Sequence, residues 1–182
     1  MDNKKEMALQ KADDNHISLS PIPKEFLDRM QKFQRGIDRP PAKVVTETIG
    51  GQSFHHLPIS YVEHLLKKFY FGLYQIEVIS YSMMVNEVTV HVRLRVFHPV
   101  LGQWMAYDGL SAMPVMMEQG SKVHEFIEKK KTKALNLNLP TAYSLAVKNA
   151  AKKIGKIFGG DLNRKHEDTY MPFNMDATPL NE

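Results

Sequence analysis

Hydrophobic and polar residues alternate most regularly between positions 88 and 97 of this chain. Valine or leucine occupies every second position, at Val88, Val90, Val92, Leu94 and Val96. The intervening positions include His91, Arg93, Arg95 and Phe97. A period of two is typical of a strand with one buried face. This run therefore predicts a strand in a sheet that covers a core on one side.

Two further β-rich runs flank this strand. Residues 73–84 precede it and residues 103–117 follow it, with short turns at 85–87 and 99–102. Short turns join antiparallel neighbours, so the three runs predict an antiparallel meander. Glycine inside a strand often marks a bulge or bend, and Gly109 predicts one in the third run.

Helical periodicity appears in three segments, at residues 20–36, 55–72 and 141–158. The first carries apolar Phe26, Leu27, Met30 and Phe33 at helical spacing. In the second, Pro58 suits the first turn. The third follows Pro140, and the pair Gly159-Gly160 is suited to end it. We therefore expect three helices, of which the last is long.

The order of these elements predicts an α+β fold. A strand at residues 44–51 precedes the second helix, and residues 123–140 predict a helical turn and then a polar, basic connection. Strands and helices that segregate along a chain favour α+β over a doubly wound parallel sheet. We expect a β-β-β-α core with an antiparallel sheet, a preceding helix and a long basic C-terminal helix packed on the sheet.

Length and composition indicate one folded domain with polar ends. The chain has 182 residues, of which 43% are hydrophobic, enough for a single core. We expect a disordered N-terminal tail at residues 1–20, a domain at residues 21–165 and a flexible C-terminal tail at residues 166–182. No apolar run approaches the length of a membrane span, and there is no cysteine. These features favour a cytoplasmic protein.

Positive charge is concentrated in one part of the chain. The net charge is +4, but residues 121–165 hold eleven Lys and Arg against three Asp and Glu. The remainder holds thirteen against seventeen and is therefore negative. Such concentration indicates an anionic partner, with nucleic acid first. A solvated helix face is the alternative interpretation.

The third predicted helix presents its lysines in a row. Lys148, Lys152 and Lys156 lie four residues apart, and Lys153 lies beside them. No acidic residue within the helix relieves their repulsion, which is about 0.2–0.5 kcal/mol per pair. Ammonium groups one turn apart match successive phosphates of a nucleic acid. Gly155 costs about 1 kcal/mol relative to alanine in a helix. It therefore predicts a close approach by a strand or by another helix, and of the two we favour a contact with the sheet.

The stretch SLAVKNAAKKIGKIFGGDLNRK, residues 144–165, resembles the signature helix of the Rad fifty-two superfamily of single-strand DNA annealing proteins. The phage Sak-type members are the most similar. The shared pattern is basic-basic-x-x-basic, an aromatic-glycine pair and a Leu-Asn-basic end, here Lys152, Lys153, Lys156, Phe158-Gly159 and Leu162-Asn163-Arg164. The resemblance extends over residues 55–165, about 60% of the chain. It implies a β-β-β-α core, assembled into rings.

By this resemblance, the chain binds and anneals single-stranded DNA in homologous recombination or phage DNA repair, without ATP, cofactor or metal. A basic groove would hold one strand by its phosphates, with the bases outward. We expect a homo-oligomeric ring or filament, in the host cytoplasm if the chain is of phage origin. A single-strand-binding protein or an exonuclease is the partner implied by family analogy. The expected DNA-binding residues are Lys148, Lys152, Lys153, Lys156, Arg164, Lys165, Arg93 and Arg95.

Other candidate sites carry less weight. His55, His56 and His64 could suggest a metal, but adjacent histidines on an extended segment point to opposite faces, so no metal site is expected. We interpret Asp108 as a turn residue before a glycine and Trp104 as a core residue. The run Lys129, Lys130, Lys131 and Lys133 is either an outer DNA contact or a solvated loop.

No motif of an enzyme stands out in the sequence. A Ser-His-Asp grouping, a phosphate-cradling glycine loop and clustered acids are all missing, so we do not expect catalysis. An RNA-binding or duplex-binding module that uses the same basic helix is the leading alternative function. A purely structural oligomer is the remaining one.

Overall fold

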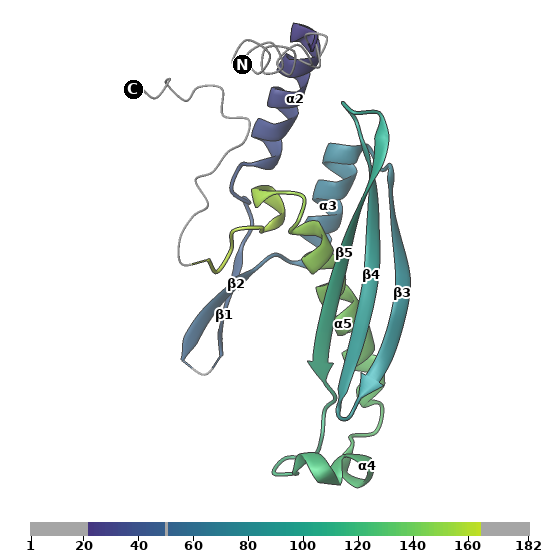
Figure 1. Ribbon diagram of the computed structural model, residues 1–182. Helices are drawn as coiled ribbons and strands as arrows, with labels where there is room; N and C mark the ends of the chain where they lie inside the picture. Colours follow the sequence, from purple (N-terminus) through teal and green to yellow (C-terminus); the bar gives the residue numbers. More distant parts are fainter. Residues whose placement is uncertain (1–21, 50, 165–182) are drawn as a thin grey trace, which may run out of the picture.

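A three-stranded antiparallel sheet forms the centre of the molecule. The computed structural model describes residues 22–49 and 51–164. Strands β3 (Tyr74–Met84), β4 (Glu87–His98) and β5 (Gln103–Pro114) pair in the order β3-β4-β5 (Figure 1). The predicted meander and the α+β class are confirmed. The tails expected at residues 1–20 and 166–182 lie outside the described residues.

The alternation in β4 decides which face of the sheet is buried. Its five predicted core positions are each no more than 4% exposed: Val88, Val90, Val92, Leu94 and Val96. Burial of such a side chain contributes about 1.5–3 kcal/mol to folding. The residues between them, including Arg93 and Arg95, lie on the opposite face and keep contact with solvent.

Helix α5 (Ala134–Ala151) covers the buried face of the sheet, and α3 (Ile59–Tyr70) packs beside it (Figure 1). The predicted bounds of the last helix, 141–158, are wrong. Helix α5 begins seven residues earlier and contains Pro140, so most of the expected basic connection is helical. It also ends at Ala151, before the short 3-10 helix η2 (Lys156–Phe158). Lys148 is the one lysine within α5, so a long basic helix is not formed.

Gly155 explains why the helix cannot continue to residue 158. Its backbone is extended, with φ 163° and ψ −178°. A Cβ atom added at this position would overlap the Cγ2 atom of Ile37, the last residue of α2 (Lys24–Ile37). The predicted close approach is therefore confirmed, but the partner is a second helix and not the sheet. The chain leaves the helical path where it passes α2.

The close contact between helix and sheet occurs at Gly109. A bend or a bulge was predicted here. This residue pairs with Val92, and the β4–β5 register is unbroken on both sides of it, so there is no bulge. The irregularity lies in β3, between Val78 and Ser80. A Cβ at Gly109 would overlap the Ala146 carbonyl oxygen and lie 2.5 Å from the Ala150 nitrogen. The glycine is needed because the backbone of α5 touches the strand.

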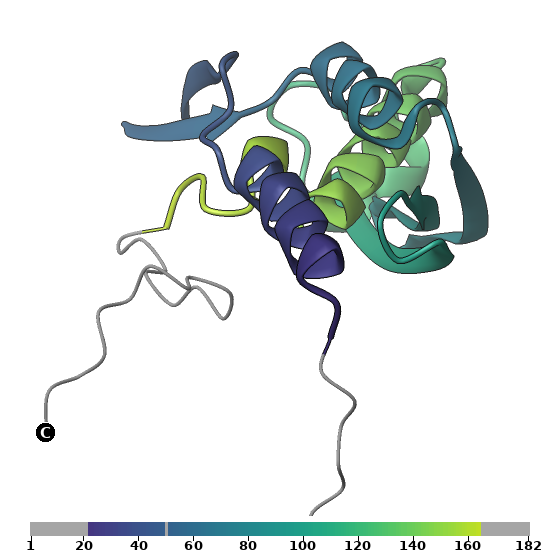
Figure 2. The ribbon, with the colours of Figure 1, turned by 90° about the horizontal axis from the view of Figure 1, so that it is seen from above.

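The predicted amphipathic N-terminal helix is confirmed as α2, which lies beside η2 (Figure 2). Phe33 of α2 meets Phe69 and Tyr70 of α3 edge to face, with ring centroids 6.5 and 6.0 Å apart. Edge-to-face aromatic pairs contribute about 0.5–1.5 kcal/mol beyond their area burial. These contacts fix α2 against the main body of the fold.

A small hairpin precedes α3. Strand β1 (Val45–Ile49) pairs with β2 (Gln52–His56), so the helix predicted from residue 55 begins only at Ile59. Asn163 ties this hairpin to the chain after η2. The His55 N–H donates to Asn163 Oδ1 and Asn163 Nδ2 donates to the His55 carbonyl, each at 2.7 Å. Part of the Leu-Asn-basic motif is thus structural.

The connection from β5 to α5 contains two short helices. The 3-10 helix η1 (Val123–Glu125) leads directly into α4 (Phe126–Lys129) at the far end of the sheet (Figure 1). The predicted helical turn is therefore confirmed. Of the helices in the described part of the chain, none combines the length and the apolar character that crossing a membrane requires.

Candidate nucleic-acid interface

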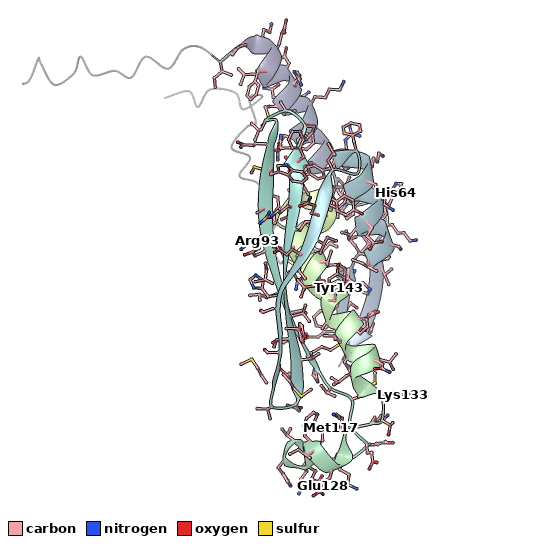
Figure 3. The ribbon with its side chains drawn as sticks, turned by 90° about the vertical axis from the view of Figure 1, so that its right-hand side faces the viewer. His64, Arg93, Met117, Glu128, Lys133 and Tyr143 are labelled. Carbon is pink, nitrogen blue, oxygen red and sulfur yellow. The ribbon has the colours of Figure 1, made fainter. Side chains whose placement is uncertain are left out.

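The two faces of the sheet differ in what covers them. Helices α3 and α5 lie together on one side, and Arg93 points away from them on the other (Figure 3). We call this second side the outer face. Directly paired residues of antiparallel strands share a face. Arg93 lies between Glu77 and Asp108, and Arg95 lies between Gln75 and Ala106.

Arg93 and Asp108 form a bidentate ion pair on the outer face. Arg93 Nε lies 2.8 Å from Asp108 Oδ1, and Nη2 lies 2.9 Å from Oδ2. His91 Nε2 is 3.4 Å from Oδ2. The hydrogen bonds from Arg93, assisted by His91, lower the pKa of Asp108 to about 2. Asp108 is thus a mid-strand partner of Arg93, and its interpretation as a turn residue is wrong.

Lys153 reaches the same place from beyond the end of α5. Its Nζ donates to the Asp108 carbonyl oxygen at the edge of β5, with a distance of 2.6 Å. Arg95 Nη2 lies 3.7 Å from Glu77 Oε2, a longer separation than in the Arg93 pair, and its side chain is 46% exposed. Arg95 and Lys153 are therefore the more available cations of this region.

These residues surround an open space of about 730 Å³, which we call the outer hollow. Its lining consists of Gln75, Arg93, Arg95, Trp104, Met105, Ala106, Tyr107, Asp108 and Lys153. Three cations and one carboxylate, Asp108, line this space, and Glu77 lies beside Arg95 as a second acid, so one positive charge remains in excess. The excess of positive charge suits an anionic ligand.

Trp104 and Phe97 form an aromatic pair at one end of the outer hollow. Their ring centroids are 5.7 Å apart with an interplanar angle of 70°. Trp104 is 49% exposed, so its interpretation as a core residue is wrong. The alternation in β4 already placed Phe97 on the arginine face. The missing signal was the strand register, which sets Trp104 opposite Phe97.

The lysines expected in one row lie in different surroundings. Lys148 is half-buried, and burial together with the charge of Lys152 lowers its pKa, while Glu47 of β1 opposes this shift. Lys152 Nζ donates to Asn149 Oδ1 at 3.3 Å, whereas Lys153 turns to β5. Lys148 and Lys152 remain neighbours, but the expected row does not extend along the helix to Lys156, because α5 ends at Ala151.

Lys156 and Arg164 meet at a carboxylate after the helix. Lys156 Nζ lies 3.2 Å from Asp161 Oδ2, and Arg164 Nη1 lies 3.3 Å from Asp161 Oδ1. Asp161 is only 21% exposed. The structure thus brings Arg93, Arg95 and Lys153 together and places these two cations around Asp161. Lys165 lies outside the described residues.

The histidines considered as metal ligands are engaged elsewhere. His55 Nδ1 lies 2.9 Å from Thr46 Oγ1, and the His64 ring stacks on Tyr61 with centroids 6.4 Å apart. Within residues 22–49 and 51–164, no three His, Cys, Asp or Glu side chains gather as a metal site would require. The lysine run at residues 129–133 was predicted to be either an outer DNA contact or a solvated loop. Of its lysines, Lys129 forms an ion pair, with Nζ 3.5 Å from Glu118 Oε2.

The Arg93–Asp108 pair makes stability depend on acid pH. The unfolded pKa of Asp is about 3.9, above the folded value of about 2. The contribution of Asp108 is thus full above pH 4 and lost as the pH falls from about 4 towards 2. We expect the free energy of unfolding to fall less steeply in Asp108→Asn than in the natural chain over this range. Urea unfolding at a series of pH values measures it, and parallel curves would contradict the expectation.

No protein-family model and no curated protein matches this chain. The resemblance of residues 144–165 to a family therefore remains a prediction from its motif. Any functional conclusion depends on the geometry of the outer face and the residues around it.

Proposed function

We propose that this chain binds single-stranded DNA and anneals complementary strands without ATP and without catalysing a bond change. The observation that carries the proposal is the convergence of Arg93, Arg95 and Lys153 on an exposed sheet face beside Trp104. Single-strand-binding surfaces combine cations that follow the backbone with aromatic rings that accept bases. The outer hollow offers both kinds of group within one space.

The cations define how a strand would be held. Arg95 and Lys153 donate to phosphates, while Arg93 is held in place by Asp108 and adds positive charge. Lys152 directly precedes Lys153 and interacts with Lys148, and we propose that these two lysines add to the positive charge that attracts the strand. Binding of phosphates releases condensed counterions, so the affinity depends on salt and little on sequence. A strand held at many points could then test a second strand for pairing.

Annealing of long strands needs many such surfaces in series. We therefore propose that the working form is a homo-oligomeric ring or filament, which the motif resemblance also supports. Its setting would be homologous recombination or phage DNA repair in the cytoplasm of the producing or host cell. A single-strand-binding protein or an exonuclease fits that setting as a partner.

The test is the rate at which two dye-labelled complementary oligonucleotides anneal with and without the protein. We expect acceleration at low salt and its loss in the double variant Arg95→Gln with Lys153→Gln. Single-strand affinity should fall at least about tenfold, because charge-assisted hydrogen bonds contribute about 1.5–3 kcal/mol each. The slope of log affinity against log salt should decrease by about 1.4 for two lost phosphate contacts.

The matched control removes two positive charges from another surface. Lys67 and Lys68 are exposed residues in the last turn of α3. Lys67→Gln with Lys68→Gln should bind and anneal like the natural chain. Equal losses in both double variants, or no acceleration by the natural chain, would overturn the proposal. Tighter binding of duplex DNA or of RNA in competition at fixed salt would favour the alternative module.

A further inference from the structure

The chain contains a single tryptophan, and the fold displays it instead of burying it. Trp104 is 49% exposed although tryptophan is among the most apolar side chains available to a core. The neighbouring Phe97 ring supports it at a centroid distance of 5.7 Å. An indole held by a second ring loses little conformational freedom when a flat ligand stacks on it.

The surroundings of Trp104 suit a planar group that carries a negative charge beside it. Ala106 follows two residues later on the same face, and its small side chain leaves space in the outer hollow beside Trp104. Arg95 lies opposite Ala106 and therefore diagonal to Trp104, about 7–8 Å away. At the other end of the outer hollow, Lys153 donates a hydrogen bond to the Asp108 carbonyl oxygen, about 13 Å along β5 from Trp104.

We propose that Trp104 is a base-stacking residue, which holds an unpaired base of the bound strand while Arg95 and Lys153 hold its phosphates. The inference rests on the function proposed above and makes it more specific. At this position the strand does not turn all its bases outward: at least one lies on the protein. The occupant is a nucleic-acid single strand, because the exposed ring shares the outer hollow with three cations, whose charge exceeds that of Asp108 and Glu77.

Base stacking would explain a preference for single strands. The faces of bases in a duplex are covered by their neighbours, whereas an unpaired base can stack on an exposed ring. Phosphate contacts alone would bind either form, since both carry the same charged backbone. Trp104 would therefore distinguish the substrate of annealing from its product and favour release of the duplex.

The experiment uses the fluorescence of Trp104, which is the only tryptophan of the full chain. The natural protein is titrated with a thymidine oligonucleotide and with an abasic oligonucleotide of equal length, which keeps the phosphates. Anisotropy of a dye on each oligonucleotide measures binding independently. We expect the thymidine strand to quench the emission and to bind about 5- to 150-fold more tightly than the abasic strand.

Two variants test the ring directly. Trp104→Ala should lose about 5- to 150-fold in affinity for the thymidine strand and nothing for the abasic strand. Trp104→Phe should keep most of the affinity, because it keeps an aromatic face. The control Tyr81→Ala removes another exposed ring, 71% exposed on β3, and should leave both affinities unchanged. Circular dichroism of each variant checks that it folds.

The outcomes separate this inference from the proposed function. Salt-dependent binding of both strands with equal affinity and unchanged fluorescence would overturn the stacking role and leave DNA binding intact. No binding of either strand would overturn both. A fluorescence change that follows protein concentration instead of DNA would assign Trp104 to a contact between copies of the chain, and would also overturn the inference.

Discussion

Replacement of Gly109 by valine is expected to cause one of the largest losses of stability in this protein. The first atom added, Cβ, would overlap the Ala146 carbonyl oxygen and lie 2.5 Å from the Ala150 nitrogen. Both are backbone atoms of a helix, so no side-chain rotation can relieve the overlap. Helix α5 must move away from the sheet, which opens the contact over Val92 and its neighbours.

Overpacking of a core usually costs about 1–3 kcal/mol, and a forced backbone shift lies at or above the upper end. We expect a loss of at least about 3 kcal/mol and a Tm lower by roughly 6–12 °C. Thermal unfolding followed by circular dichroism measures it. Strand propensity alone predicts the opposite sign, because valine favours strands over glycine.

The matched control places the same residue elsewhere on the same strand. Ala112 lies in β5 opposite Thr89 and is exposed. Ala112→Val should change the stability by less than about 0.5 kcal/mol, as is usual for surface positions. A Gly109→Val protein as stable as Ala112→Val would show that α5 does not press against the strand as the structure places it.

Replacement of Asn138 by alanine is the second substitution with a large expected effect. Asn138 is 1% exposed within α5. Its Nδ2 donates to the Pro114 carbonyl oxygen at 3.1 Å, and its Oδ1 accepts from the Met116 N–H at 3.2 Å. One buried amide thus satisfies two backbone groups where the chain leaves the sheet. Without it, both backbone groups lose this partner in a part-buried position.

A hydrogen bond contributes about 0.5–1.5 kcal/mol net, so we expect Asn138→Ala, which loses two, to lower the stability by about 1–3 kcal/mol. Asn136 offers a matched control, because it is exposed in the same helix. Asn136→Ala should be neutral or slightly stabilising, since alanine has the higher helix propensity. Urea unfolding measures both variants. Equal effects would mean that the two hydrogen bonds of Asn138 contribute nothing specific.

The outer face shows how a carboxylate can belong to a basic surface. Asp108 lies among cations, where an unpaired acid would repel phosphate. Its two hydrogen bonds with Arg93 cancel that charge and hold the guanidinium in one orientation. Arg93 is therefore a positioned cation, whereas Arg95 and Lys153 remain able to move towards a ligand. We therefore expect the phosphate contacts to depend more on Arg95 and Lys153 than on Arg93.

Local periodicity was enough to predict the sheet. The alternation from Val88 to Val96 repeats every second residue, and a slip of one position would bury arginines and expose valines. The buried face, the meander and the α+β class follow from this pattern. The amphipathic helix at the N-terminus follows from helical spacing in the same way. These features depend on residues that are close together in the sequence, so the pattern of a single sequence is enough to predict them.

The same pattern could not predict contacts between residues that are distant in the sequence. Helix α5 ends at Ala151, and Gly155 then passes against Ile37, more than one hundred positions earlier in the chain. Beyond this end, Lys153 contacts the sheet at Asp108 and Lys156 leaves the line of Lys148 and Lys152. Trp104 is exposed because the register sets it opposite Phe97. Periodicity describes one element at a time, whereas the candidate site arises where three strands and the end of a helix meet.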